Sequence, residues 1–241
     1  MSAMLAVVKG DRIHMMADAA IYDYRTGVLT DIVQKVWEMP GGAGCFSMRG
    51  SAGLFMPFLA ACSEFEYEGL DSFRHVADEV WTLFETWLPA GLGCEVMIAG
   101  WSEEFKQGQV LYRTSDHVHE DLPPGCWFLL GERCAFGIDL EDLPDAEDFD
   151  PVTHGLPAFE RARVYVNDLA WGASEPVMGH GVGGYVLSAV MEPGTAPEGV
   201  KLHQWPDEVG RRIEPEGVTL LEVPAVGQAE VQAEVQAGGT S

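Results

Sequence analysis

This sequence has few basic residues for its size. Its 241 residues include 14 lysines and arginines against 38 aspartates and glutamates, a formal net charge of -24. Proteins that bind nucleic acid need basic side chains for the phosphates, and anionic membrane surfaces attract the same side chains. The composition therefore argues against both kinds of partner. An excess of acid is typical of a well-solvated surface, and a partner with a basic face is the alternative.

Cysteines are also scarce, and no CxxC motif occurs. The five cysteines are Cys45, Cys62, Cys94, Cys126 and Cys134. Their odd number and irregular spacing predict neither a disulfide framework nor a zinc site. Four of them lie in apolar surroundings, which indicates buried thiols in a reduced protein.

Long apolar runs are missing as well. No stretch approaches the ~18 apolar residues that a membrane-spanning helix needs. Lys9, Asp11 and Arg12 interrupt the apolar start of the chain, so no secretory signal peptide is expected. We therefore predict a cytoplasmic protein that does not enter a membrane.

The hydrophobic pattern predicts groups of strands separated by helices. Strands are expected at 3–9, 12–18, 19–24, 28–39, 43–48, 95–101, 109–115, 126–130, 183–191 and 200–205, and the short strand at 126–130 is expected to be buried. Helical spacing predicts helices at 51–65, 71–88 and 157–172. This order is typical of the α+β class. We expect a single domain over 1–224, and a disordered, low-complexity tail over 225–241 that repeats Gln-Ala-Glu-Val.

Ser2 could act as an N-terminal nucleophile. Methionine aminopeptidases generally remove Met1 before a small residue, and Ser2 would then carry both a free α-amine and a hydroxyl. An α-amine has a reference pKa near ~8, so its neutral form can take the proton of its own hydroxyl. A nearby lysine would stabilise the alkoxide, and a carboxylate would orient that lysine. The commoner explanation of a serine at this position is a small residue that favours expression.

Three features at suitable spacing follow Ser2. Asp18 ends the second predicted strand, Lys35 follows the next hairpin, and Gly50-Ser51-Ala52-Gly53 leads into the first helix. In this order and spacing, residues 2 to about 60 resemble the β-type subunits of the 20S proteasome and their HslV-like bacterial relatives, within the Ntn-hydrolase superfamily. The spacing of Lys35 needs one extra residue in the turn at 24–27, where insertions are tolerated.

The resemblance implies a fold, a set of catalytic residues and a kind of assembly. The fold is a four-layer α-β-β-α sandwich. Ser2 would replace the family's nucleophilic threonine, with Asp18 and Lys35 in its catalytic positions. A proteasome-type subunit also implies a homo-oligomeric ring, a peptide substrate, an ATPase or scaffold partner, and no cofactor.

Other parts of the family's machinery are altered in this sequence. The oxyanion hole would lie at Gly50, with the backbone of Arg49 and Ser51, but Arg49 stands where the family has its glycine. A supporting serine is missing from the turn at 130–133, and an Asp and a Ser are missing from 179–184. His180 falls where the family keeps that Asp, so it is a candidate substitute.

Other polar clusters have structural explanations. His14 should face the same side of its strand as Asp18, where it could tune the site or simply be a satisfied core residue. His117 and His119 make a His-x-His pattern with no recognisable third ligand, so a polar loop is expected rather than a metal site. The acidic stretch 139–151 lacks the spacing of a calcium loop and indicates a solvated face.

Three functions follow from these observations. The first is a proteasome-type peptidase subunit with Ser2 as nucleophile. The second is a catalytically inactive protein of the same fold that serves as an oligomeric structural component, for example in a phage or mobile element. The third is a small-molecule amidase of the same superfamily.

Overall fold

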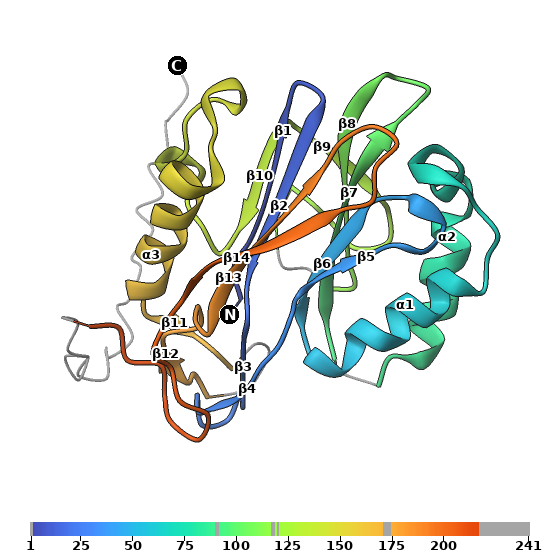
Figure 1. Ribbon diagram of the computed structural model, residues 1–241. Coiled ribbons are helices and arrows are strands. Elements are labelled where there is room, and N and C mark those ends of the chain that lie inside the picture. The colour runs from blue at the N-terminus through green and yellow to red at the C-terminus, as the bar shows by residue number, and fades with distance from the viewer. Residues whose placement is uncertain (1, 90–91, 117–118, 120, 171–174, 217–241) are drawn as a thin grey trace, which may run out of the picture.

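The fold is described from a computed structural model of the chain (Figure 1). The described residues are 2–89, 92–116, 119, 121–170 and 175–216. The predicted tail over 225–241 lies outside them. No helix in the described part of the chain is both long and apolar enough to cross a membrane.

The chain alternates between groups of strands and helices. The strands are β1 (Met4–Lys9), β2 (Arg12–Asp18), β3 (Ala20–Tyr22), β4 (Leu29–Ile32), β5 (Val36–Glu38), β6 (Cys45–Gly50), β7 (Cys94–Ser102), β8 (Gln107–Thr114), β9 (Phe128–Leu130), β10 (Arg133–Phe136), β11 (Asn167–Asp168), β12 (Met178–Gly179), β13 (Tyr185–Met191) and β14 (Glu198–Gln204). The α-helices are α1 (Phe55–Ser63), α2 (Gly69–Trp87) and α3 (Leu156–Val164). A π-helical turn, Pro151–Gly155, leads into α3, and short 3-10 turns are formed by Pro40–Gly42, Ala52–Leu54, Leu140–Asp142 and Ala146–Asp148.

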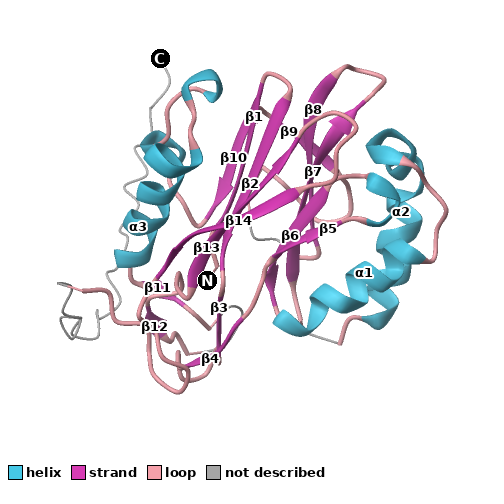
Figure 2. Ribbon diagram, viewed as in Figure 1, coloured by secondary structure: helices cyan, strands magenta, loops and turns pink. Residues whose placement is uncertain are grey.

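Most strands belong to two antiparallel sheets. The first sheet has the order β10-β1-β2-β13-β14, and the second has the order β5-β6-β7-β8-β9. The ribbon shows α3 beside the first sheet, and α1 with α2 beside the second (Figures 1 and 2). The strand pairs β3-β4 and β11-β12 form two small sheets. The predicted α+β class is confirmed.

Alternate side chains of β1 pack on opposite faces of the first sheet. Met4 and Ala6 pack with residues of the second sheet, such as Met97 and Tyr112. Leu5 and Val7 point the other way and pack with α3 and the segment before it. β1 therefore buries both of its faces, which explains the nearly continuous apolar run at the start of the chain.

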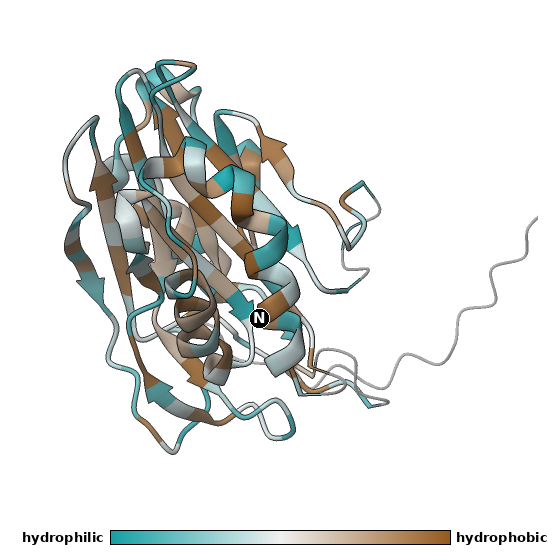
Figure 3. Ribbon diagram, turned by 90° about the vertical axis from the view of Figure 1, so that its right-hand side faces the viewer, coloured by the Kyte–Doolittle hydropathy of each residue, from teal (hydrophilic) through white to brown (hydrophobic). Residues whose placement is uncertain are grey.

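A third hydrophobic cluster joins α1 and α2 to the second sheet. Phe58 of α1 lies at its centre, with ring centroids 5.1 Å from Phe46 of β6 and 5.3 Å from Phe84 of α2. The buried residues of α2 recur at helical spacing and are Leu70, Phe73, Ala77, Val80, Trp81 and Phe84. The mixture of hydrophilic and hydrophobic residues along α2 is visible in Figure 3.

Four details differ from the sequence-based expectations. The strand expected to be buried at 126–130 is instead the edge strand β9, and Leu129 is 55% exposed. The third helix ends at Val164 because the backbone of Tyr165 is extended, with φ -71° and ψ 135°. The long strand expected at 28–39 is divided between β4 and β5, which belong to different sheets. The short strands β10, β11 and β12 were not expected, and β11 lies within the range expected for the third helix.

Replacing Phe58 with alanine should destabilise the protein strongly. The buried ring contacts both α2 and the second sheet, so its loss leaves a cavity and should lower the free energy of unfolding by about 3–5 kcal/mol. Met56→Ala is the control, because Met56 is on the same helix and 59% exposed, and its effect should stay within about 0.5 kcal/mol. Denaturant unfolding measures both values, and equal effects would contradict this packing.

Candidate active site

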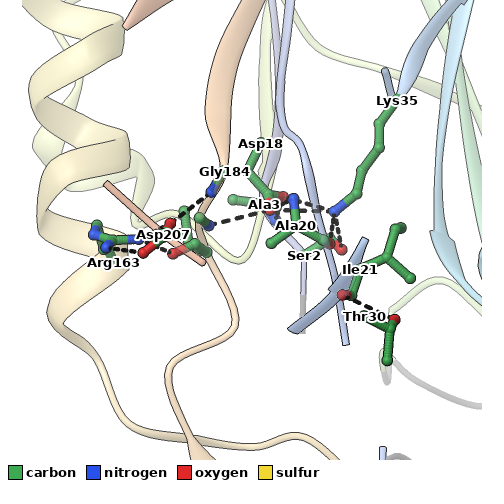
Figure 4. Close-up of polar contacts among 12 residues, drawn as sticks. Ser2, Ala3, Asp18, Ala20, Ile21, Thr30, Lys35, Arg163, Gly184 and Asp207 are labelled. Atoms are coloured by element: carbon green, nitrogen blue, oxygen red, sulfur yellow. Dashed lines mark hydrogen bonds and ion pairs between the residues drawn. The ribbon is translucent and has the colours of Figure 1, made fainter. Parts of the chain in front are cut away.

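The structure brings Ser2, Asp18 and Lys35 into direct contact (Figure 4). Ser2 precedes β1, and Asp18 ends the neighbouring antiparallel strand β2. The backbone of Ala3 pairs with Asp18, so the strand register places the start of the chain beside the carboxylate. Lys35 enters from the segment between β4 and β5. Three segments that are separate in sequence therefore form one cluster.

The Lys35 ammonium is surrounded by oxygen acceptors. Its Nζ donates to Ser2 Oγ at 2.8 Å, to the two carboxylate oxygens of Asp18 at 3.2 and 3.1 Å, and to the Ala20 carbonyl at 2.5 Å. The side chain is 2% exposed. Three acceptor groups match the three N–H donors of an ammonium, so the buried charge is fully hydrogen-bonded. These hydrogen bonds favour the charged form of Lys35, whose ammonium donates one of them to Ser2 Oγ.

Backbone amides hold Asp18 in place. Its Oδ1 accepts from the amide of Ala3 at 2.9 Å, and its Oδ2 accepts from the amides of Ala20 at 3.0 Å and Gly183 at 3.3 Å. Asp18 is 1% exposed. These contacts come from the residue before β1, from the first residue of β3 and from the turn before β13. Asp18 therefore fixes the position of Lys35 and ties together three backbone segments.

The pKa of Lys35 is lowered from its ordinary value. Burial is the main cause, and it outweighs the opposing attraction of the Asp18 carboxylate. The Arg49 guanidinium adds a second positive charge nearby and lowers the pKa further. Lys35 can therefore lose its proton more readily than a free lysine.

A shallow cavity begins beside this cluster. Its volume is about 340 Å³, and it is lined by Ile21, Asp31, Val33, Gln34, Trp37, Ala52, Gly53, Phe55 and Met56. Ile21 and Gln34 of its lining are chain neighbours of Ala20 and Lys35, whereas Ser2, Asp18 and Lys35 do not line the cavity themselves. A mainly apolar wall with one carboxylate suits a small apolar or cationic group.

The predicted oxyanion region lies at the end of β6. The β5–β6 ladder ends at Val36 and Ser47, so the backbone of 48–50 runs past β5 on the side of Lys35. Gly50 has φ +122°, and a Cβ there would lie 2.5 Å from the Gly93 carbonyl, which explains a glycine at this position. Ser51 precedes the turn into α1, and its side chain does not cap that turn.

Arg49 directs its side chain into a buried polar network. Its Nη1 lies 2.8 Å from Glu95 Oε2, and the two side chains are 5% and 0% exposed. Glu95 Oε1 also accepts from the hydroxyl of Tyr112 at 2.7 Å and lies 2.6 Å from Nε2 of His119. The positive charge of Arg49 is therefore neutralised by the Glu95 carboxylate.

His180 and His14 lie apart from the Lys35 cluster. Among the described residues, the Nδ1 of buried His180 lies 3.2 Å from the Tyr165 carbonyl, and no hydrogen bond joins its ring to Ser2, Asp18 or Lys35. His14 is four strand residues from Asp18, roughly 13 Å at ~3.3 Å per residue. It packs on Phe149 and lines a separate cavity of about 370 Å³.

The remaining candidates give no metal site. In the part of the chain that the structure describes, no three His, Cys, Asp or Glu side chains gather as metal ligands. His119 instead contacts Glu95, and His117 lies outside the described residues. Four of the five cysteines are buried, and Cys126 is exposed.

Two further polar residues near the site could not be predicted from the sequence. Arg163 of α3 and Asp207, which follows β14, form a buried ion pair beside the turn that contacts Asp18. They are separated by 44 residues, and neither lies in a recognisable motif. Only the fold brings them together.

Comparisons with known proteins give no assignment. No protein-family model matches the chain, and no curated protein matches it. The fold and the geometry of the Lys35 cluster must therefore carry the functional argument.

Removing the Lys35 ammonium should destabilise the fold. In Lys35→Met, the buried carboxylate of Asp18 loses its counter-ion, and we expect the free energy of unfolding to fall by about 3–5 kcal/mol. The same change at exposed Lys106, which pairs with Glu103 on the surface, should cost less than about 1 kcal/mol. Urea unfolding of both variants is the measurement. Similar small losses of unfolding free energy in the two variants would contradict a stabilising role of Lys35 toward Asp18.

The titration of Lys35 should be visible by NMR, since the chain has only four lysines. We expect its ε-carbon to titrate below the ~10.4 of a model lysine. Because the pKa is lower in the folded state, the unfolded chain binds more protons between the two pKa values, and stability rises with pH across that window. The contribution of this pKa shift to the free energy of unfolding is fully present above pH ~10.4, and it is lost as the pH falls through the pKa of Lys35 in the folded protein. A midpoint at or above the model value would refute the shift.

Proposed function

We propose that this protein is an Ntn hydrolase of the proteasome β type, with Ser2 as the nucleophile of an amide-cleaving reaction. The observation that carries the proposal is the contact of Lys35 Nζ with both Ser2 Oγ and the Asp18 carboxylate. This is the arrangement that an N-terminal nucleophile requires: a hydroxyl, a cation that stabilises its alkoxide, and a carboxylate that orients the cation.

The distribution of the core supports the four-layer α-β-β-α sandwich of that superfamily. One hydrophobic cluster takes residues from α1, α2 and the second sheet, one from both sheets, and one from the first sheet and α3. Three clusters separating four layers are what such a sandwich needs. The Lys35 cluster then lies at the end of the space between the sheets.

The proposed reaction begins with removal of the residue before Ser2. The freed α-amine takes the proton of Ser2 Oγ as that oxygen attacks the carbonyl carbon of an amide, while Lys35 Nζ stabilises the developing charge on Oγ. The C–N bond breaks, the leaving amine receives the proton from the α-ammonium, and an ester on Oγ remains. Water, deprotonated by the same amine, then hydrolyses the ester and restores Ser2.

The backbone at the end of β6 would stabilise the oxyanion. We assign this role to the amides of Arg49, Gly50 and Ser51, because this segment extends past β5 on the side of Lys35. The adjacent cavity of about 340 Å³ would hold the side chain or acyl group next to the cleaved bond. A peptide substrate, a homo-oligomeric ring and an ATPase or scaffold partner belong to this proposal.

Two observations favour the other functions of the same fold. The volume of the cavity lies at the lower end of small-molecule sites, about 300–1,000 Å³, which suits an amidase with a small substrate. Arg49, paired with Glu95, stands at the oxyanion position, which suits a catalytically inactive structural protein. Labelling of Ser2 separates the inactive protein from the two enzymes, and hydrolysis of peptides separates the enzymes from each other.

Ser2 should react with an electrophilic probe in the mature protein. After confirming by intact mass that the residue before Ser2 is removed, a β-lactone probe should add once to wild-type protein and to Ser2→Thr. Ser2→Ala should lose labelling and any amide hydrolysis by at least about 1,000-fold, because it lacks the attacking oxygen. Ser63→Ala, which changes an exposed serine at the end of α1, is the control. Retained Met1, or equal labelling of Ser2→Ala, would exclude the proposed nucleophile.

A further inference from the structure

We propose that Asp207 and Arg163 are positioning residues for Asp18, acting through the backbone of the turn at 182–184. This inference rests on the proposed function, since Asp18 orients Lys35 toward Ser2. Figure 4 shows the connection, which runs from the ion pair beside α3, through the turn before β13, to the Lys35 cluster.

The ion pair is buried and bidentate. Arg163 Nη1 donates to Asp207 Oδ2 at 2.9 Å and Nη2 donates to Oδ1 at 2.6 Å, and the two side chains are 6% and 4% exposed. The guanidinium also lies over the ring of Trp205, with Cζ 4.7 Å from its centre. Two parallel charge-assisted hydrogen bonds fix the relative orientation of the two groups.

Both members of the pair also bind the backbone of the turn. Arg163 Nη1 donates to the Val182 carbonyl at 3.0 Å, and Asp207 Oδ2 accepts from the Gly184 amide at 2.7 Å. The peptide unit between Val182 and Gly183 therefore has Arg163 on its carbonyl. Its N–H donates to Asp18 Oδ2 at 3.3 Å. One peptide group thus connects the guanidinium to the carboxylate that holds Lys35.

A hydrogen bond to the carbonyl of an amide strengthens the donor at its N–H end. The charged guanidinium on Val182 O should therefore strengthen the contact from Gly183 N–H to Asp18. Asp207 neutralises the charge of Arg163, so the effect reaches Asp18 through the polarised amide and the fixed turn. Two other titratable groups lie next to the turn in sequence: His180, whose pKa is lowered mainly by burial, and Tyr185, whose pKa is raised by burial.

The turn is shaped to admit these two side chains. A Cβ at Gly183 would lie 2.6 Å from Asp207 Oδ2 and 3.0 Å from Arg163 Nη1, so only glycine leaves room for the pair. Gly184 has φ +75°, and a Cβ there would lie 2.8 Å from Ile32. The Gly183-Gly184 sequence is thereby explained by the close approach of the ion pair on one side and of β4 on the other.

Packing alone would not require charges at this place. Buried ion pairs are costly to desolvate, and apolar residues of similar volume often replace them without loss of stability. Apolar side chains could pack beside Trp205, but they could not bind the Val182 carbonyl and the Gly184 amide. The charged pair is therefore explained by the orientation of the turn.

The test compares Asp207→Asn, Arg163→Lys and the apolar double variant Arg163→Met with Asp207→Leu. The control is Glu208→Gln, which changes the adjacent, exposed carboxylate paired with Arg211. Three quantities are measured: exchange of the Gly183 amide, the NMR titration midpoint of Lys35, and the rate at which a β-lactone labels Ser2. The double variant keeps the test informative if Asp207→Asn fails to fold.

The positioning role predicts a coordinated change. Each variant of the pair should speed Gly183 exchange, lower the Lys35 midpoint further and slow Ser2 labelling about 10- to 100-fold, because Asp18 then holds the lysine less firmly. Glu208→Gln should resemble wild type. A folded double variant with the Gly183 exchange and Lys35 midpoint of wild type would overturn the inference. If Ser2 of the wild type is unreactive, the proposed function fails, while exchange and titration still decide the role of the pair.

Discussion

Burial of the Lys35 ammonium is the constraint on which this structure depends. A charge removed from water must meet a full set of acceptors, and here they come from the start of β1, the end of β2 and the backbone just after it. The amides of Ala3, Ala20 and Gly183 in turn fix Asp18. One lysine therefore dictates how the strand ends, the β3 segment and the turn before β13 meet.

Charge in the interior follows a different rule from charge on the surface. The chain carries a net charge of -24, yet four cationic side chains in the described residues are buried, each with a carboxylate partner: Lys35 with Asp18, Arg49 with Glu95, Arg113 with the exposed Asp78, and Arg163 with Asp207. Each pair joins residues far apart in sequence. Buried pairs add little net stability, but a wrong arrangement leaves a charge unpaired. They therefore select one arrangement of sheets, turns and helices over its alternatives.

Local patterns predicted much of the fold but only part of the site. The β1–β2 hairpin, α2 and the β13–β14 pair follow from alternation and helical spacing, and they were found as expected. Ser2, Asp18 and Lys35 were identified from their spacing, and the structure brings them into contact. The burial of β9 and the end of α3 were mispredicted, because sheet position and backbone context decide them. The pairing of Asp207 with Arg163 could not be predicted from local patterns, because the two residues come together only in the folded chain.

The position of Asp207 along the chain has a consequence for biosynthesis. It follows every strand of both larger sheets, and the segment around it binds the Gly184 amide and, at Gly210 and Arg211, the backbone of Leu29. A ribosome would release Ser2, Asp18 and Lys35 long before Asp207 emerges. The β1–β2 hairpin can therefore form before the turn at 182–184 has been synthesised. On this geometry, Ser2 would reach its final position only near the end of translation, when nearly all of the described fold is available to enclose it.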